Sequence, residues 1–151
     1  MSGTEADLVR RLLAIHLLRA RGEAAAAAAL EDALAGALRA DRRLAAYGSL
    51  APGKENHREL AHLSGRWLPG MVRGRLLDRG WGARLGFPAL RWDPTGPEVA
   101  VQLFESDDLP RHWDHLDAFE GPDYDRRLVP VCCAEGVLAA WLYVVAEARE
   151  R

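Results

Sequence analysis

The chain has 151 residues, of which 49% are hydrophobic and 28% are charged, and its formal net charge is −2. These values are typical of a globular protein that buries its own core. A slightly acidic chain lacks the positive field that draws proteins to nucleic acid or to an anionic membrane surface. No apolar run approaches the roughly 20 residues that cross a bilayer, and the start is polar and acidic, unlike a secretory leader. We therefore expect a cytoplasmic protein with no nucleic-acid or membrane partner.

Residues 1–41 differ in composition from the rest, and we expect them to form an N-terminal helical extension. They contain no proline, tyrosine, tryptophan or phenylalanine, and Gly22 separates an early run from a second run at 23–39. Apolar residues at helical spacing in the two runs are Leu8, Leu12 and Ile15, and then Leu30, Leu34 and Leu38. This pattern predicts a helical hairpin. The hairpin would dock on the main domain, pair with another subunit in a homo-oligomer, or stay in solvent.

Residues 42–151 form the main domain in this interpretation, and glycine punctuates their short apolar runs. We expect a brief helix at 57–62 and strands at 44–47, 67–77, 99–104, 128–131 and 137–145. The run at 67–77 is one strand or two, because Pro69-Gly70 interrupts it, and glycines 74, 80, 82 and 86 with Pro88 indicate bends of a tightly curved sheet. One longer helix with Asp107 or Asp108 as its cap ends at Gly121-Pro122. A single such helix among short strands predicts an α+β domain with a small barrel-like sheet.

Glu120 occupies an unusual place for a carboxylate. It follows the apolar stripe of the predicted helix and precedes Gly121, so it faces the negative end of the helix dipole, where lysine or arginine is favoured. This position and partial burial both raise the pKa of a carboxyl group, which favours proton transfer near neutral pH. An exposed glutamate at a helix end fits the same pattern, so the position alone leaves a catalytic and a neutral role open.

The segment Tyr47-Gly48-Ser49-Leu50 runs from a predicted strand into a loop that contains Pro52-Gly53. Backbone N–H groups of such a loop can converge on one point and bind an anion, although an ordinary turn at a strand end has similar residues. The stretch 48–54 also has the spacing of a phosphate-binding P-loop, but Glu55 stands where that motif needs serine or threonine. We therefore do not expect a nucleotide-hydrolysing site.

Histidines and cysteines give no strong indication of a metal site. His112 and His115 stand three residues apart on the predicted helix, a spacing that needs a third ligand to hold a metal. A polar helix face explains the two histidines as well. Cys132 and Cys133 are adjacent, so they make a poor disulfide, and we expect one buried and one partly exposed thiol. We predict no metal and no cofactor.

Two motifs together make the chain resemble the γ-glutamylcyclotransferase-like superfamily. The first motif is Tyr47-Gly48-Ser49-Leu50 with Pro52-Gly53 and Asn56-His57, and the second is Leu116-Asp117-Ala118-Phe119-Glu120-Gly121 followed by Tyr124, Arg126 and Val129. The resemblance spans about residues 43–145 and leaves the N-terminal segment outside. It implies a small mixed β-barrel with flanking helices, and a cavity where the two motifs meet.

The resemblance also implies an activity: cyclisation of the γ-glutamyl group of a small amine, amino acid or peptide to 5-oxoproline, with release of the amine. Glu120 would be the general acid and base, without a cofactor. The residues implied in substrate binding are Tyr47, Gly48, Ser49, Leu50 and Tyr124. Arg126 would be an ion-pair partner, and Tyr143 is a further candidate for the cavity. The leaving amine and the oligomeric state stay open, and the alternative function is a non-catalytic module that binds a small carboxylate or mediates assembly.

Overall fold

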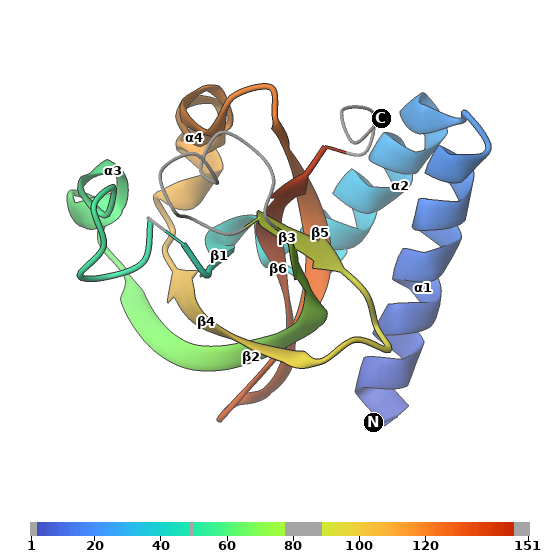
Figure 1. Cartoon of the computed structure of the whole chain (residues 1–151), viewed down its shortest axis with the longest axis horizontal. Coiled ribbons are helices and arrows are strands. Elements are labelled where there is room, and N and C mark those ends of the chain that lie inside the picture. Colours follow the sequence, from blue (N-terminus) through green and yellow to red (C-terminus); the bar gives the residue numbers. More distant parts are fainter. Residues whose placement is uncertain (1–2, 49, 78–88, 147–151) are drawn as a thin grey trace.

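The computed structural model of the chain describes residues 3–48, 50–77 and 89–146. Within these ranges the helices are α1 (Gly3–Ala20), α2 (Ala24–Ala37), η1 (Ala40–Arg42), α3 (Arg58–Ala61), η3 (Leu109–Arg111) and α4 (Trp113–Glu120). The strands are β1 (Arg43–Ala46), β2 (Arg66–Leu77), β3 (Ala89–Trp92), β4 (Glu98–Glu105), β5 (Tyr124–Cys133) and β6 (Gly136–Val145). The α1–α2 hairpin stands along one side of the sheet, and α3 and α4 lie toward the other (Figure 1). No helix in the described part of the chain has the length and apolar character to cross a membrane.

Five of the strands close into a barrel. The strand order is β3-β2-β4-β1-β6-β5, and β2 also pairs with β5, which joins the two sides of the sheet. The pairing of β1 with β6 is parallel, and the pairings of β2 with β4 and of β5 with β6 are antiparallel, so the sheet is mixed. β3 extends the barrel as an extra strand on β2. The predicted small mixed β-barrel with flanking helices and an N-terminal helical hairpin is confirmed.

The long strand β2 makes the closure possible because it curves around the barrel without a break (Figure 1). The predicted interruption at Pro69-Gly70 is therefore wrong: Gly70 pairs with Val101 on one side and with Cys133 on the other. A Cβ atom at Gly70 would lie 2.8 Å from Val131 Cγ1, so glycine lets three strands approach closely there. The predicted bends at glycines 80, 82 and 86 and at Pro88 lie outside the described residues.

The hydrophobic core has two parts, one inside the barrel and one between its outer face and the helices. The inner part consists mainly of Val72, Leu90, Val101, Leu103, Val129, Val131, Ala140 and Leu142. Successive residues of a strand point to opposite faces, so β6 contributes to both parts. Ala140 and Leu142 face inward, whereas Trp141 and Tyr143 pack outward against the helices. The second part therefore holds the helices against the barrel.

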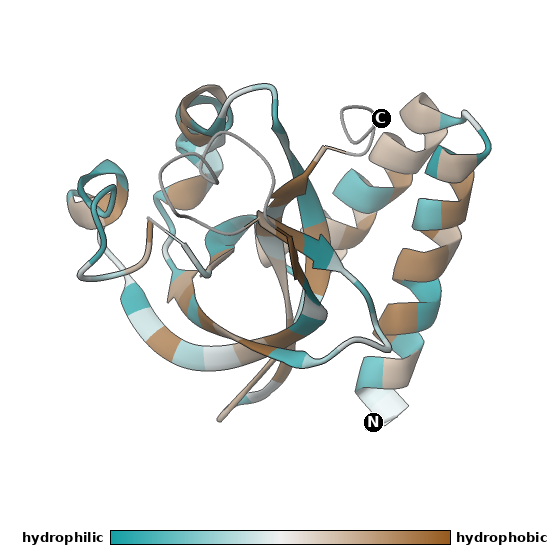
Figure 2. Cartoon of the chain, viewed as in Figure 1, coloured by the Kyte–Doolittle hydropathy of each residue, from teal (hydrophilic) through white to brown (hydrophobic). Residues whose placement is uncertain are grey.

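The hairpin docks on the barrel of its own chain, one of the three arrangements that the sequence left open. Leu12 and Ile15 of α1 belong to the same buried cluster as Trp141 of β6. Brown, hydrophobic segments recur along both helices and along the strands in Figure 2. Burial of these side chains against the sheet supplies the main driving force for docking.

The face of α2 that packs inward is formed by residues other than the leucine stripe, although Leu34 of that stripe packs partly against the core. Ala27, Glu31 and Ala35 are buried, whereas Leu30 and Leu38 are 52% and 39% exposed. The small alanine side chains allow the helix to approach its neighbours closely. Leucine in place of Ala27 or Ala35 would hold α2 further from its neighbours, so the alanine face is the one that packs.

Glu31 is a charged residue at a buried position, and it has partners on two elements. The guanidinium of Arg19 on α1 donates a hydrogen bond to Glu31 Oε1. The backbone N–H of Leu128 on β5 donates to Glu31 Oε2 over 3.0 Å. A buried carboxylate is tolerated when it is paired and hydrogen-bonded in this way. Glu31 therefore connects both helices of the hairpin to the barrel.

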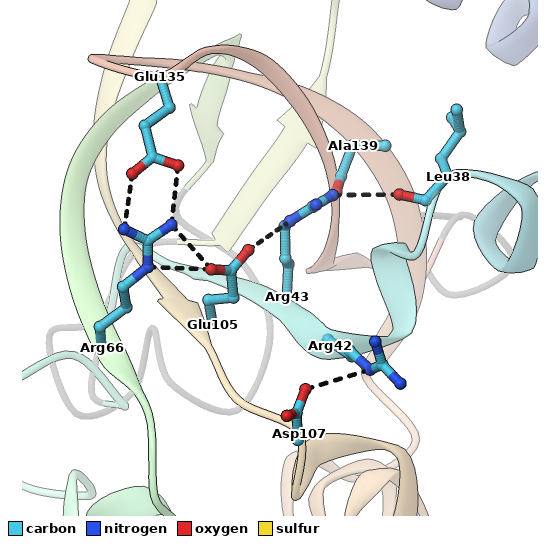
Figure 3. A network of polar contacts seen from close by, with 8 residues as sticks. All are labelled: Leu38, Arg42, Arg43, Arg66, Glu105, Asp107, Glu135 and Ala139. Carbon is cyan, nitrogen blue, oxygen red and sulfur yellow. Dashed lines mark hydrogen bonds and ion pairs between the residues drawn. The ribbon is translucent and has the colours of Figure 1, made fainter.

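A network of ion pairs joins strands of the barrel at their surface (Figure 3). Glu105 of β4 accepts hydrogen bonds from Arg43 Nε over 3.0 Å and from Arg66 Nε over 2.9 Å. Arg66 also makes two hydrogen bonds to Glu135, of 2.6 and 2.7 Å. The hydrogen bond from Arg43 and the one from Arg66 hold the pKa of the Glu105 carboxyl below its ordinary value, against a smaller opposing effect of burial. These pairs link β1, β2 and β4 to the turn between β5 and β6.

Candidate active site

Glu120 is the last residue of α4, as the sequence predicted, but the helix begins differently. The predicted single helix is divided into η3 and α4, and Asp108 makes no side-chain cap on η3. The Asp108 carboxylate instead accepts a hydrogen bond from the Ser64 N–H over 2.9 Å. After Glu120 the chain turns at Gly121, whose φ of 79° lies in the region that favours glycine. This turn ends the helix at Glu120.

The carboxyl group of Glu120 lies in an environment that disfavours its charge. Burial, and to a lesser extent the negative charge of Asp117, raises its pKa from the ordinary 4.5 to about 7. A group with this pKa is present in both protonation states near neutral pH. It can therefore accept and return a proton under those conditions.

Tyr47 and Tyr143 interact electrostatically with Glu120. Burial is the main reason why the pKa of each phenol is raised, and the charge of Glu120 acts in the same direction. The Tyr47 hydroxyl donates to the backbone oxygen of Tyr143 over 2.8 Å and accepts from the Leu90 N–H over 2.9 Å. Tyr124 belongs to the same group, because its electrostatic interaction with Tyr47 also raises the pKa of Tyr47. The structure thus brings Glu120 together with the three tyrosines of the predicted site.

The predicted substrate loop follows β1 directly. Leu50 is buried, and its backbone oxygen lies 3.1 Å from Nδ1 of His57. The Ala51 N–H donates to the Gly48 oxygen over 3.1 Å, which closes a turn. A Cβ atom at Gly48 would have no described atom within 4 Å. Ser49 lies outside the described residues, so the anion-binding role of the loop amides stays a prediction.

Asp117 is a site residue that the sequence reasoning did not single out. It accepts two hydrogen bonds from Arg126, of 2.9 and 3.2 Å, and one from the Tyr143 hydroxyl of 2.7 Å. Arg126 therefore forms the ion pair expected of it. Residues three apart on a helix are neighbours, so the spacing between Asp117 and Glu120 was a signal that could have identified Asp117.

A hollow of about 650 Å³ lies between α2 and the outer face of β5 and β6. Tyr124, Tyr143 and Asp117 line it from the barrel side, and Ala28 and Asp32 line it from α2. Glu120 is not among the described residues of its wall.

The other candidate residues have contacts of their own. Nε2 of His112 lies 3.0 Å from the backbone oxygen of Glu59, and Nε2 of His115 lies 3.1 Å from the Glu59 carboxylate. Cys132 and Cys133 are both partly exposed, so the expectation of one buried thiol is wrong. The two cysteines lie at the end of β5 that pairs with β2, near the edge of the inner core.

Comparison with known proteins places the chain in a family. The family model described as Gamma-glutamyl cyclotransferase, AIG2-like matches residues 44–151, which leaves the whole hairpin outside. No functionally curated protein sequence matches the chain. The solved structures that match the chain have low sequence identities to it, so their similarity shows a shared fold and nothing about function.

YkqA from Bacillus subtilis is 23% identical with a TM-score of 0.56, and the match covers 69% of this chain and 35% of YkqA, so the chain spans about a third of that protein. An AIG2-like protein from Mus musculus is 23% identical with a TM-score of 0.55, over 70% of this chain and 77% of the mouse chain. A protein from Arabidopsis thaliana is 18% identical with a TM-score of 0.53, over 70% and 69% of the two chains. The barrel of these proteins is the barrel described above, and the family model covers more than half of the chain. The chain therefore belongs to the gamma-glutamyl cyclotransferase, AIG2-like family.

Proposed function

We propose that the chain is a γ-glutamylcyclotransferase-like enzyme that converts the γ-glutamyl group of a small amine, amino acid or peptide into 5-oxoproline. Family membership supports this reaction class. The observation that carries the proposal is the partly buried carboxyl group of Glu120, whose pKa is raised to about 7. A carboxyl group tuned in this way is suited to proton transfer at neutral pH.

The reaction requires one proton to be moved between two nitrogen atoms. The α-amine of the substrate attacks the γ-carbonyl carbon, and Glu120 accepts the proton that this nitrogen loses. The bond between the γ-carbon and the leaving nitrogen then breaks, and Glu120 returns the proton to the departing amine. The products are 5-oxoproline and the free amine, and the enzyme regains its starting state. One group acts as base and then as acid, and the chemistry uses residues of the chain alone.

Binding must fold the substrate so that its amine meets its own carbonyl. We propose that the backbone amides of Gly48, Ser49 and Leu50 hold the α-carboxylate or the oxyanion of the intermediate. Tyr47 contributes its ring to the wall, because its hydroxyl is already engaged by Tyr143 and Leu90. Tyr124 is the second aromatic wall in this proposal. Holding the reacting groups in contact supplies a large part of the rate gain in such intramolecular reactions.

The test is incubation of the protein with a panel of γ-glutamyl amines, amino acids and peptides, followed by an assay for 5-oxoproline. Glu120→Gln removes the proton acceptor with little change in shape, and we expect it to lower the rate by about 10²-fold or more. Glu98→Gln, on the exposed surface of β4, is the matched control and should keep wild-type activity. Equal rates in Glu120→Gln and wild type would refute the role of Glu120.

The alternative is a binding or assembly module on the same fold, and one observation favours a role in assembly. Leu13, Leu17 and Leu30 of the hairpin are 44%, 56% and 52% exposed, although other leucines of α1 are buried. Exposed apolar side chains of this kind are found at contacts between subunits. Light scattering would show whether the protein is a monomer. Binding of a panel compound without 5-oxoproline formation would favour the module over the enzyme.

A further inference from the structure

The carboxylate of Asp117 is held more firmly than that of an ordinary surface residue. Its Oδ1 accepts the Tyr143 hydroxyl over 2.7 Å and Arg126 Nε over 2.9 Å, and its Oδ2 accepts Arg126 Nη2 over 3.2 Å. These donors come from β5 and β6, whereas Asp117 belongs to α4. Three charge-assisted hydrogen bonds from two strands fix the position of the carboxylate and of the helix turn that carries it.

Arg126 is itself held by two tryptophans. Its guanidinium lies 4.5 Å from the ring centroids of Trp113 and Trp141, between α4 and β6. The Trp113 Nε1–H donates to the backbone oxygen of Asp41 over 2.9 Å, and the Trp141 Nε1–H donates to the Asp41 carboxylate over 2.9 Å. Cation–π contact with both rings restricts the guanidinium, so Arg126 presents its donors to Asp117 in a fixed direction.

We propose that Asp117 is a positioning residue for Glu120: clamped by Arg126 and Tyr143, it fixes the last turn of α4 and places its carboxylate one turn before the Glu120 carboxyl. This inference adds to the proposed function. It depends on that function only in taking Glu120 as the residue that transfers protons. The effect of Asp117 on Glu120 is a property of the folded protein without substrate.

The groups around Glu120 support this assignment. Asp117 lies one helical turn before Glu120 on the same helix, and its charge adds to the effect of burial on the pKa of Glu120. The Tyr47 and Tyr143 phenols also face Glu120, but burial keeps them protonated at neutral pH, so neither is an anion there. Arg126 is the counter-ion that holds Asp117 in place. Asp117 is therefore a charged group that raises the pKa of Glu120, second to burial.

The experiment follows the Glu120 carboxyl by NMR in protein labelled with ¹³C in its glutamate side chains, without substrate. The signal that disappears in Glu120→Gln identifies the residue. Asp117→Asn removes the charge but keeps an oxygen that can accept from Tyr143 and Arg126, and we expect the pKa of Glu120 to fall by about 0.5 or more. The matched control is Asp114→Asn, an exposed aspartate one turn earlier on α4, which should leave the titration unchanged.

A second variant separates charge from hydrogen bonding. Tyr143→Phe removes a donor to Asp117 and keeps the Asp117 charge, so the pKa of Glu120 should stay at or above the wild-type value. Near-ultraviolet circular dichroism of the tryptophans checks that each variant is folded. A titration of Glu120 that is the same in Asp117→Asn as in Asp114→Asn would overturn the inference.

The same variants distinguish this inference from the proposed function. If a substrate is cyclised, the acidic limb of the kcat/KM profile should move to lower pH in Asp117→Asn, together with the titration of Glu120. A titration that shifts in a protein that makes no 5-oxoproline would support the role of Asp117 and count against the enzyme. If the enzyme is active but the pKa of Glu120 is unchanged in Asp117→Asn, the result would count against this inference and not against the proposed function.

Discussion

Glu120→Gln should make the folded protein more stable than wild type at pH 8. Burial raises the pKa of Glu120 from 4.5 to about 7, so the folded state binds a proton more tightly than the unfolded state. Between these two pH values the native state holds more protons, and stability therefore falls as the pH rises. At about 1.4 kcal/mol for each pKa unit, the folded state loses about 3 kcal/mol once Glu120 is ionised. Glutamine has nearly the same shape and never ionises, so the variant escapes this loss.

Urea unfolding followed by tryptophan fluorescence measures the effect at pH 8 and again near pH 4.5. With a slope of about 2 kcal/mol per molar urea, the midpoint of Glu120→Gln should exceed that of wild type by about 1.5 M at pH 8. The difference should shrink toward zero at the lower pH, because wild-type Glu120 is then protonated. Glu98→Gln, an exposed change of the same kind, should give no such gain. A difference that is independent of pH would refute the buried, pKa-shifted state of Glu120.

Three further predictions follow from the structure. If Glu120 is the base, kcat/KM for any cyclised substrate should fall as the pH is lowered through about 7, because the carboxylate becomes protonated there. Glu31→Ala should cost about 3 kcal/mol in urea unfolding, because it leaves the partly buried Arg19 and the Leu128 N–H without their partner, whereas Asp32→Ala at an exposed position of α2 should change stability by less than about 0.5 kcal/mol. Tyr47→Phe should cost about 1–3 kcal/mol, since the Leu90 N–H loses its acceptor, and thermal unfolding would show it.

The strands that alternate regularly were the easiest to predict from the sequence. The predicted strands at 99–104 and 137–145 correspond to β4 and β6, with ends that differ by one residue. β5 begins four residues earlier than predicted, because the polar residues 124–127 pair with β6 although they carry no apolar alternation. β3 was not predicted, since four residues on the edge of a sheet leave too short a pattern.

The hydrophobic periodicity of the sequence could not predict the tertiary contacts of the site. The sequence placed Glu120 correctly at a helix end, because an apolar stripe and Gly121 mark that end within a few residues. The clamp on Asp117 depends on donors from β5 and β6, which meet α4 only after the barrel has closed. The inward face of α2 depends similarly on Arg19, which is twelve residues from Glu31. In a helix that is mostly alanine and leucine, either face is apolar enough to pack, so the sequence pattern does not show which face turns toward the barrel.

The hairpin lies entirely outside the family match, yet it is hydrogen-bonded to β5, the strand that carries Arg126. Glu31 accepts the Leu128 N–H on β5, two residues after Arg126. Asp41, at the junction of hairpin and barrel, accepts hydrogen bonds from both tryptophans that enclose Arg126. These contacts join α2 and the segment after it to Arg126, which pairs with Asp117 one turn before Glu120. The hairpin therefore contacts the strand that carries Arg126, on the side of the barrel where Tyr124 and Tyr143 line the hollow beside α2.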